Sequence, residues 1–127
     1  MSELEYLDAR RRGQIELVSR RLHDRIVIGV SGEVDLATVG AVERELLVAE
    51  ECHRLVVLDL SNTSFMDSTG IHMIIAATRR LQQRGGHLVV VQGPPPVRRL
   101  LELTGVAEHV ELVDDADDVG RAAAASG

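Results

Sequence analysis

Two short polar segments carry the side chains best suited to chemistry. One is Gly32-Glu33-Val34-Asp35, and the other is Asp67-Ser68-Thr69-Gly70, which directly follows Phe65 and Met66. Each segment places a carboxylate where a helix is predicted to begin, and the second segment adds two hydroxyls. Because the positive end of a helix tolerates added negative charge, a hydroxyl there can be phosphorylated without loss of the fold. The two segments therefore predict a surface whose charge can be changed.

Ser68 has two roles open to it. Serine is a preferred N-cap, so its oxygen could accept a backbone N–H at the start of the helix. Alternatively, the hydroxyl stays exposed and accepts a phosphoryl group, which adds a charge of about −1.5 to −2. With Asp67 beside it, that charge would repel any partner surface arranged to receive a neutral hydroxyl. Residue type alone leaves both roles open, and Thr69 offers a second hydroxyl.

Other kinds of site find little support. The 5 histidines lie in separate segments without ligand spacing, and the single cysteine, Cys52, can form neither an intramolecular disulfide nor a four-ligand zinc site. The chain has no lysine and no glycine-rich phosphate loop. We therefore expect no metal, no cofactor and no catalytic residue. Nucleotide binding between the two aspartate-bearing segments is the enzyme-class alternative, although two carboxylates repel a phosphate unless a metal intervenes.

The hydrophobic pattern predicts the elements that position these segments. Runs rich in β-branched residues have strand length, and other apolar residues recur at helical spacing. The expected strands cover residues 14–19, 25–31, 54–60, 87–92 and 110–113. The expected helices cover residues 36–50 with Asp35 as N-cap, 68–83, 97–104, and the alanine-rich stretch after Asp118.

Strands that alternate with helices predict an α/β fold with right-handed crossovers. We expect a single domain over residues 14–125, built on a mixed, mostly parallel β-sheet with an N-terminal antiparallel hairpin. About four α-helices should cover this sheet. Residues 1–13, which include Arg10-Arg11-Arg12, are expected to form a flexible N-terminal arm.

Composition narrows the class of protein. A length of 127 residues favours one domain, and 45% hydrophobic with 27% charged residues is typical of a globular chain. The apolar runs are far shorter than the about 20 residues that cross a membrane, and the N-terminus lacks the order of a secretion signal. The net charge is −6, and only 2% of the residues are aromatic, so few side chains could stack on the bases of a nucleic acid. We expect a cytoplasmic monomer that binds neither nucleic acid nor membrane.

The two polar segments and the order of the expected elements resemble a STAS-domain anti-sigma factor antagonist. The resemblance spans roughly residues 14–118, including the proline-then-leucine segment that ends at Gly105. It implies partner switching in transcription regulation: the unphosphorylated protein would bind an anti-sigma factor that is also a serine kinase, and so release a sigma factor. Phosphorylation of Ser68 by that kinase would abolish the binding, and a serine phosphatase would restore it. ATP and magnesium would belong to the kinase.

The resemblance also implies a partner-binding surface around Ser68, formed by Asp35, Met66, Asp67, Thr69, Gly70 and His72. His72 departs from the family, which often has a small residue at that position. Its imidazole either belongs to the partner surface or simply faces solvent from the helix. The interaction-class alternative is that the domain is a constitutive scaffold or subunit of another complex, such as a stress-signalling assembly or a transporter.

Overall fold

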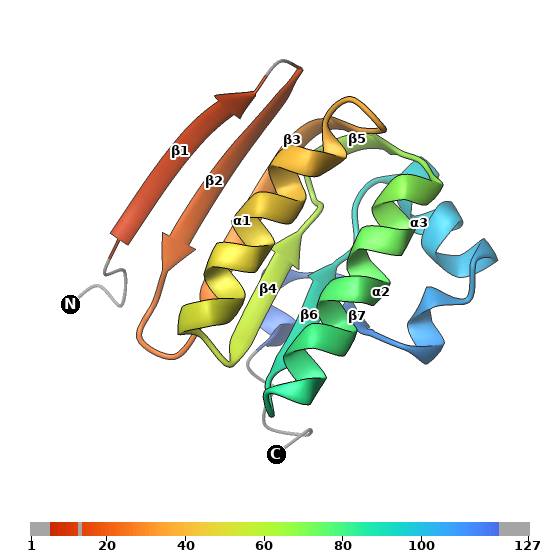
Figure 1. The fold of residues 1–127 in the computed structure, drawn as a ribbon. Coiled ribbons are helices and arrows are strands. Elements are labelled where there is room, and N and C mark those ends of the chain that lie inside the picture. The colour runs from red at the N-terminus through yellow and green to blue at the C-terminus, as the bar shows by residue number, and fades with distance from the viewer. Residues whose placement is uncertain (1–5, 13, 120–127) are drawn as a thin grey trace.

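The computed structural model describes residues 6–12 and 14–119 of the chain (Figure 1). These residues form a seven-stranded sheet in the order β1-β2-β3-β4-β6-β7, with β5 paired to β3. Pairs β1–β2 and β2–β3 are antiparallel, and all other pairs are parallel. The predicted α/β class is confirmed, as is the mixed, mostly parallel sheet with an N-terminal antiparallel hairpin. The strands are β1 (Tyr6–Arg12), β2 (Ile15–Arg21), β3 (Ile26–Val34), β4 (Leu55–Asp59), β5 (Thr63–Met66), β6 (His87–Val91) and β7 (Glu111–Val113).

The N-terminal segment departs from the prediction of a flexible arm. Residues 6–12 form strand β1, which pairs with β2 from Tyr6↔Arg21 to Arg12↔Ile15. The arginines hide this strand in the sequence because charged residues are common on edge strands, which need no continuous apolar pattern. Residues 1–5 and 13 lie outside the described part of the chain.

Three α-helices occur among the described residues: α1 (Val39–Cys52), α2 (Ser68–Gln83) and α3 (Pro95–Leu103). Figure 1 shows α1 and α2 side by side in front of the sheet. Of about four helices predicted, the last falls largely on residues 120–127, which lie outside the described part of the chain. In the described ranges, no helix combines the length and the apolar character that a membrane span requires.

The main core lies between the helices and one face of the sheet. Buried side chains alternate along the strands and recur at helical spacing, as the sequence pattern predicts. The core includes Ile28 and Leu58 from the sheet and Leu46, Ile74 and Leu101 from the three helices. A smaller cluster covers part of the opposite face and consists of Val27, Val57, Val89, Val91 and Val119.

A buried ion pair fixes α1 against α2. The Glu50 side chain is 1% exposed and accepts two hydrogen bonds from Arg80, at 2.7 and 2.9 Å. Arg84 donates a further hydrogen bond to the backbone carbonyl of Glu50 at 3.2 Å. The hydrogen bond to Glu50 raises the pKa of Arg80 above its usual value, so this guanidinium stays charged. These contacts join the C-terminal halves of the two helices.

The order of the parallel strands bears on where a site can form. Strands β3, β4, β6 and β7 follow one another across the sheet in chain order. Right-handed crossovers that all run in one direction place their helices on the same face. Doubly wound sheets bind ligands in a crevice where the strand order reverses, and this series of strands has no reversal. The fold therefore favours a site on the loops at the strand ends.

Strand β3 is long enough to pair with two strands on the same side. Its first half pairs with β4, and its second half pairs with β5 after a register shift between Gly32 and Glu33. Gly32 has a φ of +113°, and a Cβ at this position would overlap the carbonyl oxygen of Gln14. Glycine is therefore required for the bend. As a result, β3 and β5 end side by side.

Candidate functional site at the start of helix α2

The two polar segments singled out in the sequence lie next to each other. Val34, the last residue of β3, pairs with Met66, the last residue of β5. Immediately beyond this pair, the backbone N–H of Asp67 donates to the carbonyl oxygen of Val34 at 3.2 Å. The turn that leads into α1 and the first turn of α2 therefore emerge together at one edge of the molecule.

Asp67, and not Ser68, is the N-cap of α2. The Asp67 backbone is extended, and its carboxylate accepts the N–H of Thr69 at 2.9 Å and the hydroxyl of Thr69. The capping role that the sequence left open for Ser68 is thus filled by its neighbour. Thr69 also has its hydroxyl committed to this cap.

Ser68 is the first residue of α2, and it is exposed. Its hydroxyl makes no hydrogen bond to any other residue in the described ranges. Ser68 stands in the first turn of α2, and the positive end of a helix dipole favours negative charge. The local geometry therefore leaves the Ser68 oxygen accessible and places it where an added phosphate is tolerated.

Asp35 caps a separate turn before α1 and is not the N-cap of the helix. Its carboxylate accepts the backbone N–H groups of Ala37 at 3.0 Å and Thr38 at 3.2 Å. The Thr38 hydroxyl donates to the carbonyl of Glu33 at 2.7 Å, so the turn is closed on itself. Helix α1 begins only at Val39, which makes the predicted start at residue 36 wrong. Asp35 is half-buried and holds the loop in shape.

Met66 and Gly70 lie beneath the site and not on its surface. Met66 is 4% exposed, and Gly70 is also buried. A Cβ on Gly70 would overlap Cγ of Met66 and would lie 3.3 Å from Cγ1 of Val34. Glycine is therefore needed here for close packing of α2 on β5. Of the six residues expected to bind a partner, these two instead support Ser68 from below.

His72 lies one helical turn beyond Ser68 and is exposed. Residues four apart on a helix share a face, so the imidazole and the Ser68 hydroxyl belong to one surface. This placement is compatible with both roles considered for His72, solvent exposure and partner contact.

Two exposed apolar side chains near Ser68 were missed by the sequence reasoning. Leu36 is 82% exposed at the turn before α1, and Phe65 is 44% exposed on β5. The helical spacing grouped Leu36 with the buried face of a helix, but the residue lies in the turn that Asp35 closes. Leu36 and Phe65 therefore add exposed apolar area to the two segments that carry the site. The sequence offers no signal for the placement of Leu36, because the turn is recognised only by the hydrogen bonds that Asp35 and Thr38 form in the structure.

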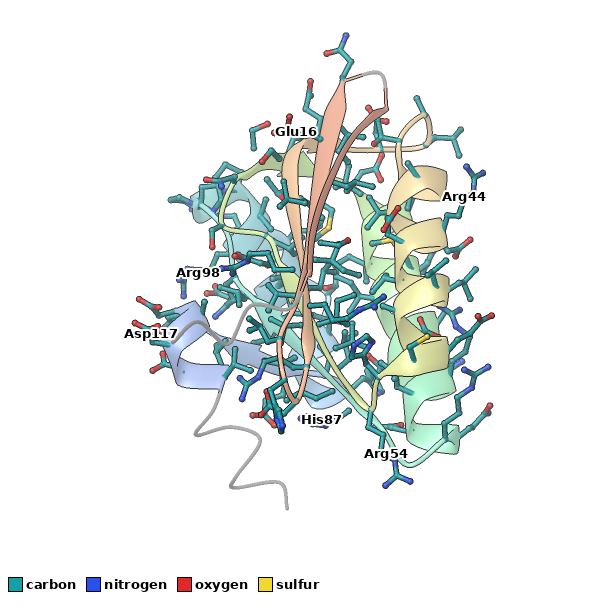
Figure 2. All side chains as sticks on the ribbon, turned by 90° about the vertical axis from the view of Figure 1, so that its left-hand side faces the viewer. Glu16, Arg44, Arg54, His87, Arg98 and Asp117 are labelled. Carbon is teal, nitrogen blue, oxygen red and sulfur yellow. The ribbon has the colours of Figure 1, made fainter. Side chains whose placement is uncertain are left out.

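A cavity of about 270 Å³ lies at the other end of the helices, lined by residues that include Cys52, His53, Arg54 and Arg84. Figure 2 shows Arg54 at that lower end, beyond the end of α1, whereas Arg44 projects from its upper half. The described residues contain no group of three or more side chains suited to hold a metal ion. The cavity is thus separate from Ser68, and the candidate site is a surface around one hydroxyl.

The chain is similar to a known domain family, to relatives of known name and to solved structures. The STAS domain model matches residues 14–119. An anti-sigma-B factor antagonist from Listeria monocytogenes is 34% identical over 96 residues, or 75% of this chain and 84% of that protein. The crystal structure of an anti-sigma factor antagonist from Mycobacterium paratuberculosis has a TM-score of 0.79 at 29% identity, over 88% of this chain and 96% of that chain. Phosphorylated SpoIIAA of Bacillus shares the fold, with a TM-score of 0.60 at 17% identity over 92% and 99% of the two chains.

Proposed function

Because this chain belongs to the STAS domain family, we propose that it acts in the cytoplasm as an anti-sigma factor antagonist. In its unphosphorylated form it binds an anti-sigma factor and so releases a sigma factor. That anti-sigma factor is also the serine kinase that phosphorylates Ser68, and a serine phosphatase reverses the modification. The names of the Listeria and Mycobacterium relatives support the antagonist role.

The exposed, uncommitted hydroxyl of Ser68 is the observation that carries this proposal. The kinase transfers the γ-phosphoryl group of ATP to the Ser68 oxygen, which loses its proton, and ADP leaves. The product carries a charge of about −1.5 to −2 directly beside the Asp67 carboxylate. The helix end tolerates this charge, so the fold persists while the surface becomes strongly anionic. No tertiary contact among the described residues has to break for the change to occur.

The partner surface combines this charge switch with apolar anchors. Leu36 and Phe65 supply exposed apolar area on the two segments that flank the switch. His72 extends the surface along α2. In the unphosphorylated state the partner covers Ser68 together with these side chains. A phosphate on Ser68 would have to lose its hydration under the partner, which opposes docking.

The test uses four immobilised proteins in native lysate: wild type, Ser68→Ala, Ser68→Glu and Gln82→Glu. The Gln82 variant adds the same charge at the exposed far end of the same helix. Wild type should retain one ATPase-like partner and release it when ATP and magnesium are added, with phosphate found on Ser68 by mass spectrometry. Ser68→Ala should hold that partner regardless of ATP, Ser68→Glu should lose it by about a hundredfold or more, and Gln82→Glu should behave as wild type.

Two results would contradict the proposal. If Ser68→Glu bound the native partner as tightly as wild type, the switch would be absent and the domain would be a constitutive scaffold. If the retained partner had no kinase activity and no link to a sigma factor, the antagonist role would fail.

A further inference from the structure

Helix α2 (Ser68–Gln83) contains no acidic residue. Its basic side chains are Arg79 and Arg80 toward its end and His72 near its start. His72 is exposed, and its imidazole forms no hydrogen bond or ion pair in the part of the chain that the structure describes. A titratable group without an anionic partner therefore lies four residues after Ser68.

The geometry of a helix brings the side chains of Ser68 and His72 toward each other. Residues four apart share a face, with Cβ atoms about 5–6 Å apart. Helical side chains also point back toward the N-terminus of their helix, so the imidazole leans over the turn that holds Ser68. The Asp67 carboxylate is engaged with the N–H and the hydroxyl of Thr69. The oxygens of a phosphate on Ser68 would thus be the free acceptors closest to the imidazole along the helix.

From this placement we propose that His72 binds the phosphoryl group on Ser68 and takes up a proton from solvent as it does so. The inference rests on the proposed function, because it needs a phosphorylated Ser68. A phosphate presents up to two negative charges on three acceptor oxygens, and an imidazolium has N–H groups to donate to them. Charge-assisted hydrogen bonds of this kind are stronger than neutral ones.

The elements packed against α2 include β5 and β6, and neither brings a carboxylate to His72. Strand β5 has no charged residue. The one titratable side chain of β6 is His87, which is bonded to Glu111 on β7 at 3.0 Å. In the turn before α1, the Asp35 carboxylate is bonded to the backbone of its own turn.

Helix α1 also packs against α2, and its charged side chains have other partners or directions. Glu50 is bonded to Arg80, and Glu45 accepts a hydrogen bond from β2. The hydrogen bond from Glu50 and, to a lesser degree, the charge of Glu43 raise the pKa of Arg80, so both carboxylates act on that arginine. Arg44 projects outward from α1 (Figure 2). A phosphate on Ser68 would therefore meet little competition for the imidazole.

The contact gives phosphorylation a second effect on the partner surface. His72 shares a face with Ser68, and an imidazole that holds the phosphate is withdrawn from a docking partner. The same imidazole covers phosphate oxygens that a phosphatase must reach. His72 thus prolongs the phosphorylated state, in which the partner is released.

Phosphorus NMR tests the contact on full-length protein with phosphoserine inserted at position 68 during translation, so no kinase is needed. The signal reports the second ionisation of the phosphate, which ordinarily lies at about pH 6. An adjacent cation favours the doubly charged form, so the midpoint should lie at lower pH with His72 present than in His72→Gln. A favourable ion pair four residues apart predicts a difference of about 0.3 pH units or more.

Two further variants separate charge from structure. His72→Lys restores a cation and should return the midpoint to the value seen with His72, or below it. His109→Gln removes another exposed histidine, which follows the short helix Val106–Glu108, and should leave the midpoint unchanged. A broad-specificity serine phosphatase should remove the phosphate from His72→Gln about twofold faster or more than from the protein with His72 or His72→Lys.

Equal midpoints with His72 and with His72→Gln would overturn the proposal. A shift that His72→Lys does not reverse, or that His109→Gln reproduces, would overturn it as well, because the contact requires a cation at this one position. Equal phosphatase rates would reject the prolonging of the phosphorylated state. Failure of the proposed function is a different result, namely a Ser68 that the retained partner does not phosphorylate.

Discussion

Helix α2 differs at its two ends. At its start, the polar side chains bond within their own loop, as Asp67 does with Thr69. Toward its end, Arg80 and Arg84 bond across to Glu50 on α1. The first set of bonds shapes a local surface, whereas the second joins two elements of the core. Negative charge can therefore be added at the start of the helix, because the polar side chains there form no hydrogen bond to another element in the described ranges.

The largest effect is expected where the contacts cross between helices. Arg80→Met leaves the buried Glu50 carboxylate without its ion-pair partner, which costs about 3–5 kcal/mol when such a pair is broken. Urea denaturation should show this loss, while partner binding by the folded fraction stays unchanged. Arg79→Met is the matched control, since Arg79 is exposed on the same helix and its loss should cost less than about 0.5 kcal/mol. Equal effects of the two substitutions would show that the ion pair does not hold the helices.

At the start of the helix we expect the reverse, a large effect on partner binding and a small effect on stability. Leu36→Ser removes an apolar side chain that is 82% exposed, so stability should change by less than about 0.5 kcal/mol. Partner affinity should fall about tenfold or more if Leu36 is an anchor of the docking surface. Leu103→Ser, at a residue 78% exposed on α3, is the matched control and should bind normally. The measurement is the dissociation constant of the captured partner by calorimetry, and an unchanged value for Leu36→Ser would remove this residue from the surface.

The smallest effect tests whether the bonds around Asp67 are local. Asp67→Ala removes the N-cap of α2 and should cost about 1 kcal/mol, whereas Asp67→Asn keeps an acceptor and should cost only a few tenths. Thermal unfolding measures both. A loss of several kcal/mol from Asp67→Ala would mean that the Asp67 side chain also holds contacts to other elements, and the contrast between the two ends would disappear.

Most of the elements could be predicted from the sequence, and their boundaries only in part. The strands at the centre of the sheet and helix α2 follow from short-range periodicity, which local residue patterns record. Strand β1 and strand β5 were missed, since each is too polar to be identified alone and forms only by pairing with β2 or β3. The same limit applied to Leu36, whose helical spacing could not reveal the turn that Asp35 closes.

The candidate site, too, could be predicted from the sequence only in part. The residue types at Asp67 and Ser68 sufficed to predict a helix start and a hydroxyl that either caps the helix or is open to modification. Which of the two caps the helix depends on where β5 ends, and the pairing of Val34 with Met66 fixes that end. Residue types and their short spacings thus determined the chemistry available to this protein. Only the tertiary structure decided which hydroxyl stays uncommitted and which apolar side chains surround it, because those outcomes depend on contacts between segments far apart in the chain.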